Sequence, residues 1–230
     1  KEIGWDVIAT IVDLWCKQSP AAIQAPAMRI GAAAAYVGDR RVPFLKHFVW
    51  PSLQTGAVYE KEYPLATALG RPLIAAQMVQ IARQEGAKAI AHGCTGKGND
   101  QVRFDVSTAA LAPDLLVVAP VREWGMNRDD EIEYAREHGI PVPATADSPY
   151  STDENLWGRS IEAGVLEAPW AEPPPEVFEW TRDPRECPDE PAYVEISFKE
   201  GLPTAIDGLP LDALEIVTLL NQLGGETGER

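Results

Sequence analysis

The feature that most constrains this chain is a glycine-rich segment that directly follows an apolar run. Residues 91–105 read Ala-His-Gly-Cys-Thr-Gly-Lys-Gly-Asn-Asp-Gln-Val-Arg-Phe-Asp; before them lie the short run 88–91 and a helical pattern ending at Gly86. A strand, a glycine-rich loop and then polar residues entering a helix is how α/β proteins place a ligand at the carboxyl ends of parallel strands. Glycine lets the backbone approach a ligand closely and turn its N–H groups toward an anion. The segment therefore predicts a ligand site at a strand end.

Polar side chains in this segment indicate the kind of ligand. A hydroxyl, an amide, a carboxylate and a guanidinium come from Thr95, Asn99, Asp100 and Arg103. A carboxylate binds an ammonium group, whereas a guanidinium and an amide bind a carboxylate or a ureido group. The set therefore suits a zwitterionic amino acid.

Other readings of the same residues are weaker. A Walker A loop requires Ser or Thr after its lysine, but Gly98 follows Lys97, and the glycine spacing fits neither this loop nor the Rossmann fingerprint. Cys94 lies near His92, which permits a thiolate nucleophile, but the surrounding glycines already account for the loop. The three histidines are scattered along the chain, so we expect no metal cluster.

Charge and cysteine usage exclude several classes of protein. The 230 residues carry a formal net charge of −15, which disfavours a nucleic-acid or anionic-membrane surface because either requires a basic face. An anionic substrate then needs locally clustered cations, and we expect Arg71, Lys97 and Arg103 to supply them. The three widely spaced cysteines form no disulfide framework or zinc pattern, and we find no signal peptide or 18-residue apolar run. We expect a cytoplasmic protein.

The order of apolar runs predicts an α/β fold. We expect strands at 5–12, 33–37, 88–91 and 115–119, and helices at 43–54, 71–85, 106–111 and 128–138. A helix at 17–29 should be short or broken, because Pro26 inside a helix costs about 3 kcal/mol. Pro51 should interrupt the helix at 43–54, and Pro72 suits the first turn of the next one. Alternating strands and helices indicate a parallel sheet wound with helices.

The character of the sequence changes after residue 143. Prolines cluster, and the segment 193–198 alternates and pairs with 203–206 as a hairpin. An amphipathic helix covers 211–223 and stops at the two glycines Gly224 and Gly225. We therefore predict two domains, 1–143 and 144–230. The first is α/β, and the second is the start of an α+β domain.

Several stretches resemble one enzyme family. Residues 92–104 resemble the argininosuccinate synthase signature His-Gly-(Ala/Cys)-Thr-Gly-Lys-Gly-Asn-Asp-Gln-Val-Arg-Phe, and the likeness continues at 60–65, 71–75, 122–124, 127–129, 151–160 and 190–194. The resemblance spans nearly the whole chain. It implies a nucleotide-binding domain of the PP-loop ATPase type followed by the beginning of a synthetase domain.

The resemblance also implies a reaction. The family joins citrulline to aspartate at the expense of ATP, which normally carries Mg²⁺, through citrullyl-AMP, and it releases pyrophosphate and AMP. The resemblance implies that the full-length enzymes of this family are homotetramers. The implied partners are these small molecules, with no nucleic acid and no membrane. No catalytic acid or base is implied, since positioning and charge stabilisation carry the reaction.

Individual residues acquire roles by motif position. The resemblance implies that Gly93 lies against ATP and that aspartate is bound by Thr95, Asn99 and Asp100. The residues implied for citrulline are Tyr63, Asn99, Arg103, Ser151 and Ser160. Without the resemblance, a packed ring would explain Tyr63, and turn or cap formation would explain Ser151 and Ser160.

Two departures from the family leave alternatives open. The family begins with a strand and a Ser-Gly-Gly-x-Asp-x-Ser loop that grips pyrophosphate, whereas this sequence starts after that point, and its 13–18 region is altered by Trp15. The family's long C-terminal part is absent as well. We therefore expect a piece of a longer gene product that makes no argininosuccinate alone. The alternatives are an inactive relative acting as an amino-acid-binding module and a structural interaction protein.

Overall fold

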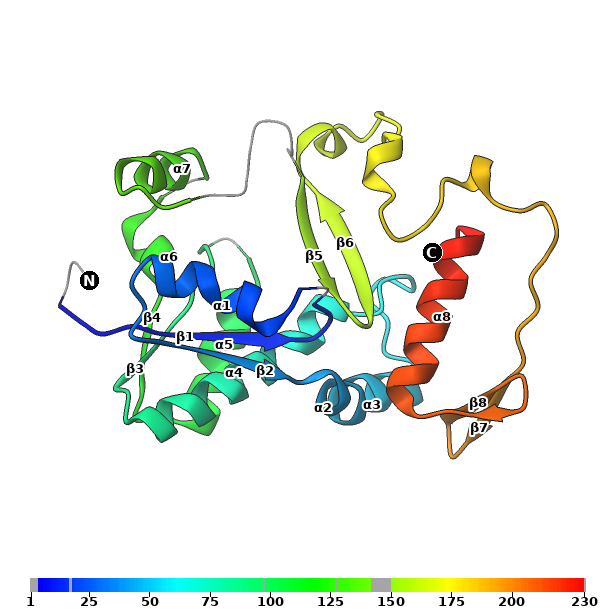
Figure 1. Cartoon of the computed structure of the whole chain (residues 1–230), viewed down its shortest axis with the longest axis horizontal. Helices are drawn as coiled ribbons and strands as arrows, with labels where there is room; N and C mark the ends of the chain where they lie inside the picture. Colours follow the sequence, from blue (N-terminus) through cyan, green and yellow to red (C-terminus); the bar gives the residue numbers. More distant parts are fainter. Residues whose placement is uncertain (1–3, 17, 97, 127, 142–149, 230) are drawn as a thin grey trace. The chain divides into compact units, whose positions relative to one another are not determined.

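Two compact units make up the structure, a computed structural model that describes residues 4–16, 18–96, 98–126, 128–141 and 150–229 (Figure 1). The first unit consists of Lys1–Arg40 and Ala68–Asp147, and the second of Arg41–Thr67 and Ser148–Arg230. Residues 41–67 thus group with the carboxyl-terminal part of the chain, an arrangement that a single boundary cannot describe. The predicted boundary at 143/144 itself lies outside the described residues.

All strand pairs of the first unit are parallel, as predicted. Strand β1 (Ile8–Asp13) pairs with β2 (Ala34–Asp39), and β3 (Ala89–Ala91) pairs with β4 (Leu116–Val118). The expectation of one sheet carrying all these strands is wrong for the described residues, which form two separate two-stranded sheets. No described strand pairs with the second edge of β1 or of β3.

Residues of both sheets line an apolar cavity of about 530 Å³. Residues of β1 and β3 line it together with side chains of the long helix α4 (Ala66–Glu85), including Ile8, Thr10, Ile90, Met78 and Ile81. The core of the first unit is a cluster of buried apolar side chains around β3. It contains the buried residues Val79, Ala82, Ile90, Ala112 and Leu115.

Helix α1 (Pro20–Arg29) is shorter than the predicted range 17–29, as one of the two predicted alternatives has it, but it is not broken, because it continues through Pro26. Proline removes the bond to the carbonyl four residues earlier, which belongs to Ala22. Both residues are exposed, so water can satisfy that carbonyl. Ser19 caps the amino end by accepting a hydrogen bond from the N–H of Ala22 (3.3 Å).

Helix α4 begins at Ala66, five residues before the predicted start at Arg71, so Pro72 lies inside it. The hydroxyl of Tyr63 accepts a hydrogen bond from the N–H of Thr67 (3.0 Å) and so satisfies one of the helix's otherwise unpaired donors. Ala66 itself is buried. The hydrogen bond to Tyr63 and the burial of Ala66 stabilise the additional turn.

The first unit also contains α5 (Asp100–Leu111), α6 (Pro120–Trp124) and α7 (Arg128–Glu137). Helix α5 begins six residues before the predicted helix at 106–111, and α6 was not predicted. None of the helices described is long and apolar enough to cross a membrane.

The second unit opens with a helical stretch whose hydrogen bonding changes along its length. It comprises α2 (Arg41–Phe44), a π-helical turn (Leu45–Val49) and α3 (Trp50–Gln54). The irregularity lies before Pro51, which occupies the first turn of α3. Because proline has no N–H to donate to a preceding carbonyl, the register changes just ahead of it.

Two antiparallel sheets follow. The hairpin of β5 (Ser151–Asn155) and β6 (Gly158–Glu162) was not predicted. The predicted hairpin is confirmed as β7 (Ile196–Lys199) and β8 (Leu202–Ile206), extended by β9 (Leu209–Pro210).

The last helix, α8 (Ala213–Thr227), passes through the two glycines at which we expected it to stop. A Cβ on Gly225 would lie 2.5 Å from the carbonyl oxygen of Trp180. Glycine is therefore needed here for close approach of two backbones rather than as a helix terminator. Asp212 and Glu215 form a capping box at the amino end.

Candidate functional site

The glycine-rich loop leaves the sheet where the sequence predicted, at the carboxyl end of β3. His92 extends the strand by one residue, since its backbone N–H donates to the carbonyl of Val118 (3.1 Å). The loop then leads into α5, which begins at Asp100. Lys97, which we expected in a cation cluster, lies outside the described residues.

Three of the predicted ligand residues are exposed: Gly93, Thr95 and Asn99. Asn99 occupies the N-cap position of α5 but makes no capping hydrogen bond with its side chain. A Cβ built on Gly93 would meet nothing within 4 Å. The loop therefore offers a hydroxyl, an amide and open backbone to solvent at the amino end of a twelve-residue helix.

Asp100 joins two arginines beside this loop. Its carboxylate accepts a hydrogen bond from Nε of Arg71 and another from Nη1 of Arg103, each at 2.7 Å. The three side chains are between 22% and 33% exposed, so a ligand can reach them while solvent screening is reduced. Two cations around one anion leave a local excess of positive charge, as a carboxylate-bearing ligand requires. Two members of the predicted cation cluster, Arg71 and Arg103, are thus brought together.

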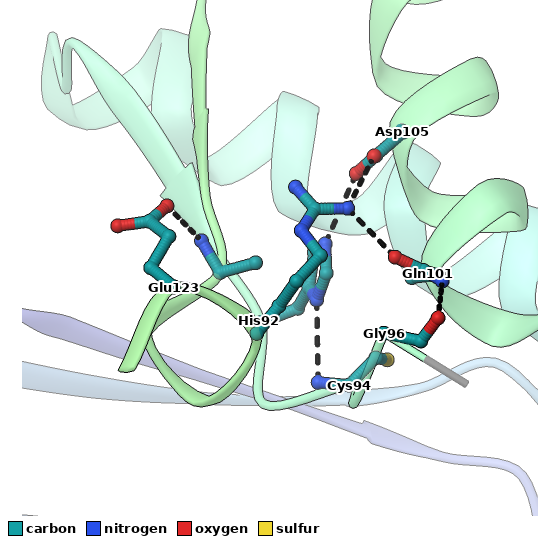
Figure 2. Close-up of polar contacts among 8 residues, drawn as sticks. His92, Cys94, Gly96, Gln101, Asp105 and Glu123 are labelled. Carbon is teal, nitrogen blue, oxygen red and sulfur yellow. Dashed lines mark hydrogen bonds and ion pairs between the residues drawn. The ribbon is translucent and has the colours of Figure 1, made fainter. Parts of the chain in front are cut away.

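A second set of polar contacts involves the first residues of the loop (Figure 2). Nε2 of His92 lies 3.1 Å from Oδ1 of Asp105, and Arg122 donates from Nη1 to Oδ2 of Asp105 (2.8 Å). The same nitrogen of Arg122 donates to Gln101 (2.9 Å), whose amide donates to the carbonyl of Gly96 (2.7 Å). These contacts connect the loop, α5 and α6.

Charges in this network support one another. Burial acts to raise the pKa of Asp105, but hydrogen bonds from Arg122 and His92 outweigh it and hold the pKa below its ordinary value. The hydrogen bond with Asp105 raises the pKa of Arg122. The pair is therefore ionised at neutral pH.

The environment of Cys94 disfavours a nucleophile. Burial, and then the charge of Asp100, raise the pKa of its thiol above the ordinary value. A protonated thiol is a poor nucleophile and a poor metal ligand. Among the described residues, no group of three or more His, Cys, Asp or Glu side chains is placed to hold a metal ion.

The second unit holds the other residues predicted for citrulline. Tyr63 ends a tight turn in which Glu60 and Lys61 have φ values of 52° and 72°, and it pairs with Tyr59 as a β-bridge. Its hydroxyl is engaged with Thr67, as described above. Tyr63 thus positions the start of α4.

Ser151 and Ser160 lie in strands β5 and β6, which corrects the alternative of turn or cap residues. Ser151 is opposite Glu162, and Ser160 is opposite Asp153. Because side chains alternate along a strand, both serines lie on the same face of the hairpin as diagonal neighbours. Both are exposed.

The end of this hairpin is fixed to the first residue of α4 and to the segment just before it. Asn155 donates to the carbonyl of Ala66 (2.7 Å), and the indole N–H of Trp157 donates to the carbonyl of Pro64 (3.1 Å). The hairpin and the Tyr63 turn thus belong to one framework within the second unit. The predicted citrulline residues are divided between the units, with Asn99 and Arg103 in the first.

Sequence reasoning missed the roles of Gln101, Asp105 and Arg122. Gln101 and Asp105 are four residues apart and so share a face of α5. The predicted helix began only at residue 106, which hid that relationship. The stretch 122–124 was noticed only for its likeness to the family.

Comparison with known proteins gives matches along most of the chain. The family model described as Arginosuccinate synthase N-terminal HUP domain matches residues 1–141, and that described as Arginosuccinate synthase C-terminal domain matches residues 150–229.

Curated relatives agree with these matches. The argininosuccinate synthase of Rubrobacter xylanophilus is 57% identical over 228 residues, which cover 99% of this chain and 56% of the relative. That of Symbiobacterium thermophilum is 54% identical over 97% of this chain and 56% of the relative, and that of Bacillus licheniformis is 50% identical over 99% and 57%. The chain therefore spans a little over half the length of these relatives.

Proposed function

Because the chain belongs to the argininosuccinate synthase family, we propose that it forms part of an ATP-dependent carbon–nitrogen ligase that joins citrulline to aspartate. In this reaction the ureido oxygen of citrulline attacks the α-phosphorus of ATP, and pyrophosphate leaves. The amine of aspartate then attacks the activated carbon, loses a proton and expels AMP. A poor leaving group on the ureido carbon makes the activation necessary.

Aspartate binds at the start of α5 in this proposal. Thr95, Asn99 and Asp100 surround it, with its ammonium group on Asp100. An ionised carboxylate offers about four acceptor positions, of which Arg71 and Arg103 occupy two in the structure. Asp100 therefore retains room for a third donor while it aligns the two arginines.

Citrulline is held by charge at one end and by neutral hydrogen bonds at the other. Arg103 binds its carboxylate, and Asn99 lies between the two amino acids. Tyr63, Ser151 and Ser160 supply hydroxyl groups, which suit an uncharged ureido group. Holding both substrates in fixed orientations accounts for much of the acceleration in reactions of this kind.

The nucleotide lies against Gly93, where the open space beside the Cα leaves room for it. Magnesium enters with the triphosphate as part of the substrate. The negative charge of the triphosphate is neutralised by this metal ion and by cations of the protein as pyrophosphate departs.

Family membership also underlies the proposed setting of the protein. It acts in the cytoplasm as a homo-oligomer, a tetramer at full length, on small molecules rather than on nucleic acid or membranes. The net charge of −15 agrees with this choice of partners.

The observation that carries the proposal is the Arg71–Asp100–Arg103 cluster beside an exposed polar loop. Because we expect the 230-residue chain alone to make no argininosuccinate, the test uses a form extended at both ends to the length of the relatives. Pyrophosphate release is measured with ATP and citrulline, alone and together, followed by AMP release after aspartate is added. Release that requires both ATP and citrulline supports the ligase. Binding of aspartate or citrulline without any release identifies an amino-acid-binding module instead, and the absence of both binding and release contradicts the proposal.

A further inference from the structure

His92 is buried at the start of the glycine-rich loop, and both of its ring nitrogens make polar contacts. Its side chain is 4% exposed, and its ring stacks on Phe104 with 5.3 Å between centroids. Nδ1 lies 3.3 Å from the backbone nitrogen of Cys94, and Nε2 lies 3.1 Å from Asp105. A backbone N–H only donates, so Nδ1 is the acceptor and the ring proton of Nε2 points to Asp105. Each nitrogen of His92 therefore has a distinct task.

The network closes on the same loop from the other side. Asp105 binds Arg122, Arg122 binds Gln101, and Gln101 holds the carbonyl of Gly96. Figure 2 draws these contacts as dashed lines, with Gln101 contacting the loop at Gly96 and His92 contacting it at Cys94. The backbone N–H of Cys94 and the backbone carbonyl of Gly96 are thereby linked to the Asp105–Arg122 ion pair, the first through His92 and the second through Gln101.

A loop of this composition needs such support. It contains three glycines, Gly93, Gly96 and Gly98, and glycine loses more conformational freedom on ordering than any other residue. A binding site loses affinity in proportion to the fraction of time that its backbone spends in other conformations. Contacts that hold the loop before the ligand arrives therefore strengthen binding without contacting the ligand.

We infer that His92, Asp105 and Arg122 are positioning residues that hold the backbone of residues 93–96 in the ligand-binding conformation. The effect on ligand affinity rests on the proposed function, whereas the effect on the loop does not. No direct contact with substrate is assigned to the three residues.

Three substitutions at His92 separate its two tasks. His92→Asn keeps an acceptor near the position of Nδ1 but loses the donor to Asp105. His92→Gln keeps a donor near the position of Nε2 but loses the acceptor for Cys94. His92→Phe keeps the aromatic stack and loses both. Substitutions of Arg122, whose side chain is only partly buried, provide a second comparison. Arg122→Lys keeps a positive charge beside Asp105, and Arg122→Met removes that charge.

The first measurement uses the ligand-free chain and follows exchange of the Cys94 amide hydrogen residue by residue by NMR. We expect exchange to become about two- to tenfold faster in His92→Gln and His92→Phe, the range for loss of one hydrogen bond. His92→Asn should exchange close to the parent rate. Arg122→Met should accelerate exchange more than Arg122→Lys. Thermal unfolding of each variant shows whether the change is local.

The second measurement is aspartate affinity by calorimetry. Affinity should fall in the same order as Cys94 protection is lost, while the melting temperature does not follow that order. Equal Cys94 exchange in all variants would overturn the inference, and so would faster exchange with unchanged affinity. If the parent itself binds no aspartate, the proposed function fails, and the exchange rates alone decide whether the network holds the loop.

Discussion

The carboxylate of Asp100 lies 2.7 Å from Nε of Arg71, a residue that precedes it by 29 positions. The pairing ties the second turn of α4 to the first turn of α5, at the loop where the sequence predicts a ligand. Arg71→Met should remove one of the two charge-assisted hydrogen bonds that hold the Asp100 carboxylate in place for the ammonium group of aspartate, and such bonds contribute roughly 1.5–3 kcal/mol. Aspartate affinity should fall about 10- to 150-fold by calorimetry. Arg83→Met, at another arginine of the same helix, is the matched control and should bind as the parent does.

Gly225 should not tolerate a side chain, because a Cβ there overlaps the carbonyl of Trp180. Gly225→Ala is expected to lower the free energy of unfolding by roughly 1–3 kcal/mol, the usual cost of overpacking. The neighbouring Gly224 has only ordinary contacts at 3.8 Å and beyond. Gly224→Ala should therefore stabilise the helix by about 0.5–1 kcal/mol. Urea unfolding of the two variants measures both effects, and equal destabilisation would contradict the assigned role of Gly225.

Asp114 should contribute stability that depends on pH. Its hydrogen bond from Arg83 lowers the pKa of its carboxyl to about 2, compared with about 3.9 in an unfolded chain. A depressed pKa in the folded state stabilises the fold above the unfolded pKa, and this stabilisation is lost as pH falls from about 4 to about 2. In a double-mutant cycle of Asp114→Asn and Arg83→Met, the coupling measured by urea unfolding should be present at pH 6 and smaller at pH 3. Coupling that is equal at both pH values would argue against the pair.

The open edges of β1 and β3 should be visible in amide exchange. Val7 accepts a hydrogen bond from Ala33, and Lys88 accepts one from Leu116. Since alternate residues of a strand direct their backbone groups to opposite sides, Ile8 and Thr10 face away from β2, as Ala89 and Ala91 do from β4.

Exchange measured by NMR should therefore be faster at those four amides than at the neighbouring strand residues Ala9, Ile11 and Ile90. Uniform protection along both strands would mean that the edges are paired in solution.

Local patterns predicted the parts of the fold that local physics decides. The apolar runs at β1 to β4 and the glycine-rich loop after β3 were recognisable because burial and glycine conformation leave direct marks in a sequence. The hairpin of β5 and β6 was missed because its first strand reads Ser-Thr-Asp-Glu-Asn, with little apolar alternation. Two prolines misled because local sequence does not show what surrounds them. At Pro26 the carbonyl that loses its hydrogen bond is exposed to water, and at Pro72 the hydrogen bond from Thr67 to Tyr63 extends the helix ahead of the proline.

The candidate site was predictable as a list of residue types but not as a network. The sequence places Thr95, Asn99 and Asp100 on one loop, because they are adjacent. The contacts of Asp105 with His92 and with Arg122 depend on how α5 and α6 pack, and no local pattern encodes them. That Asp100 makes hydrogen bonds with both Arg71 and Arg103 likewise depends on helix packing and could not be predicted from the sequence.

The central claim is that residues 93–103 form an amino-acid site. Its most direct test is calorimetric titration of aspartate into the parent chain, Asp100→Ala and Asp114→Ala. Both aspartates belong to the first unit and both pair with arginine, so the second variant controls for the loss of an ion pair. The account predicts weak binding to the parent and to Asp114→Ala, and no detectable binding to Asp100→Ala. Equal binding by all three would contradict it.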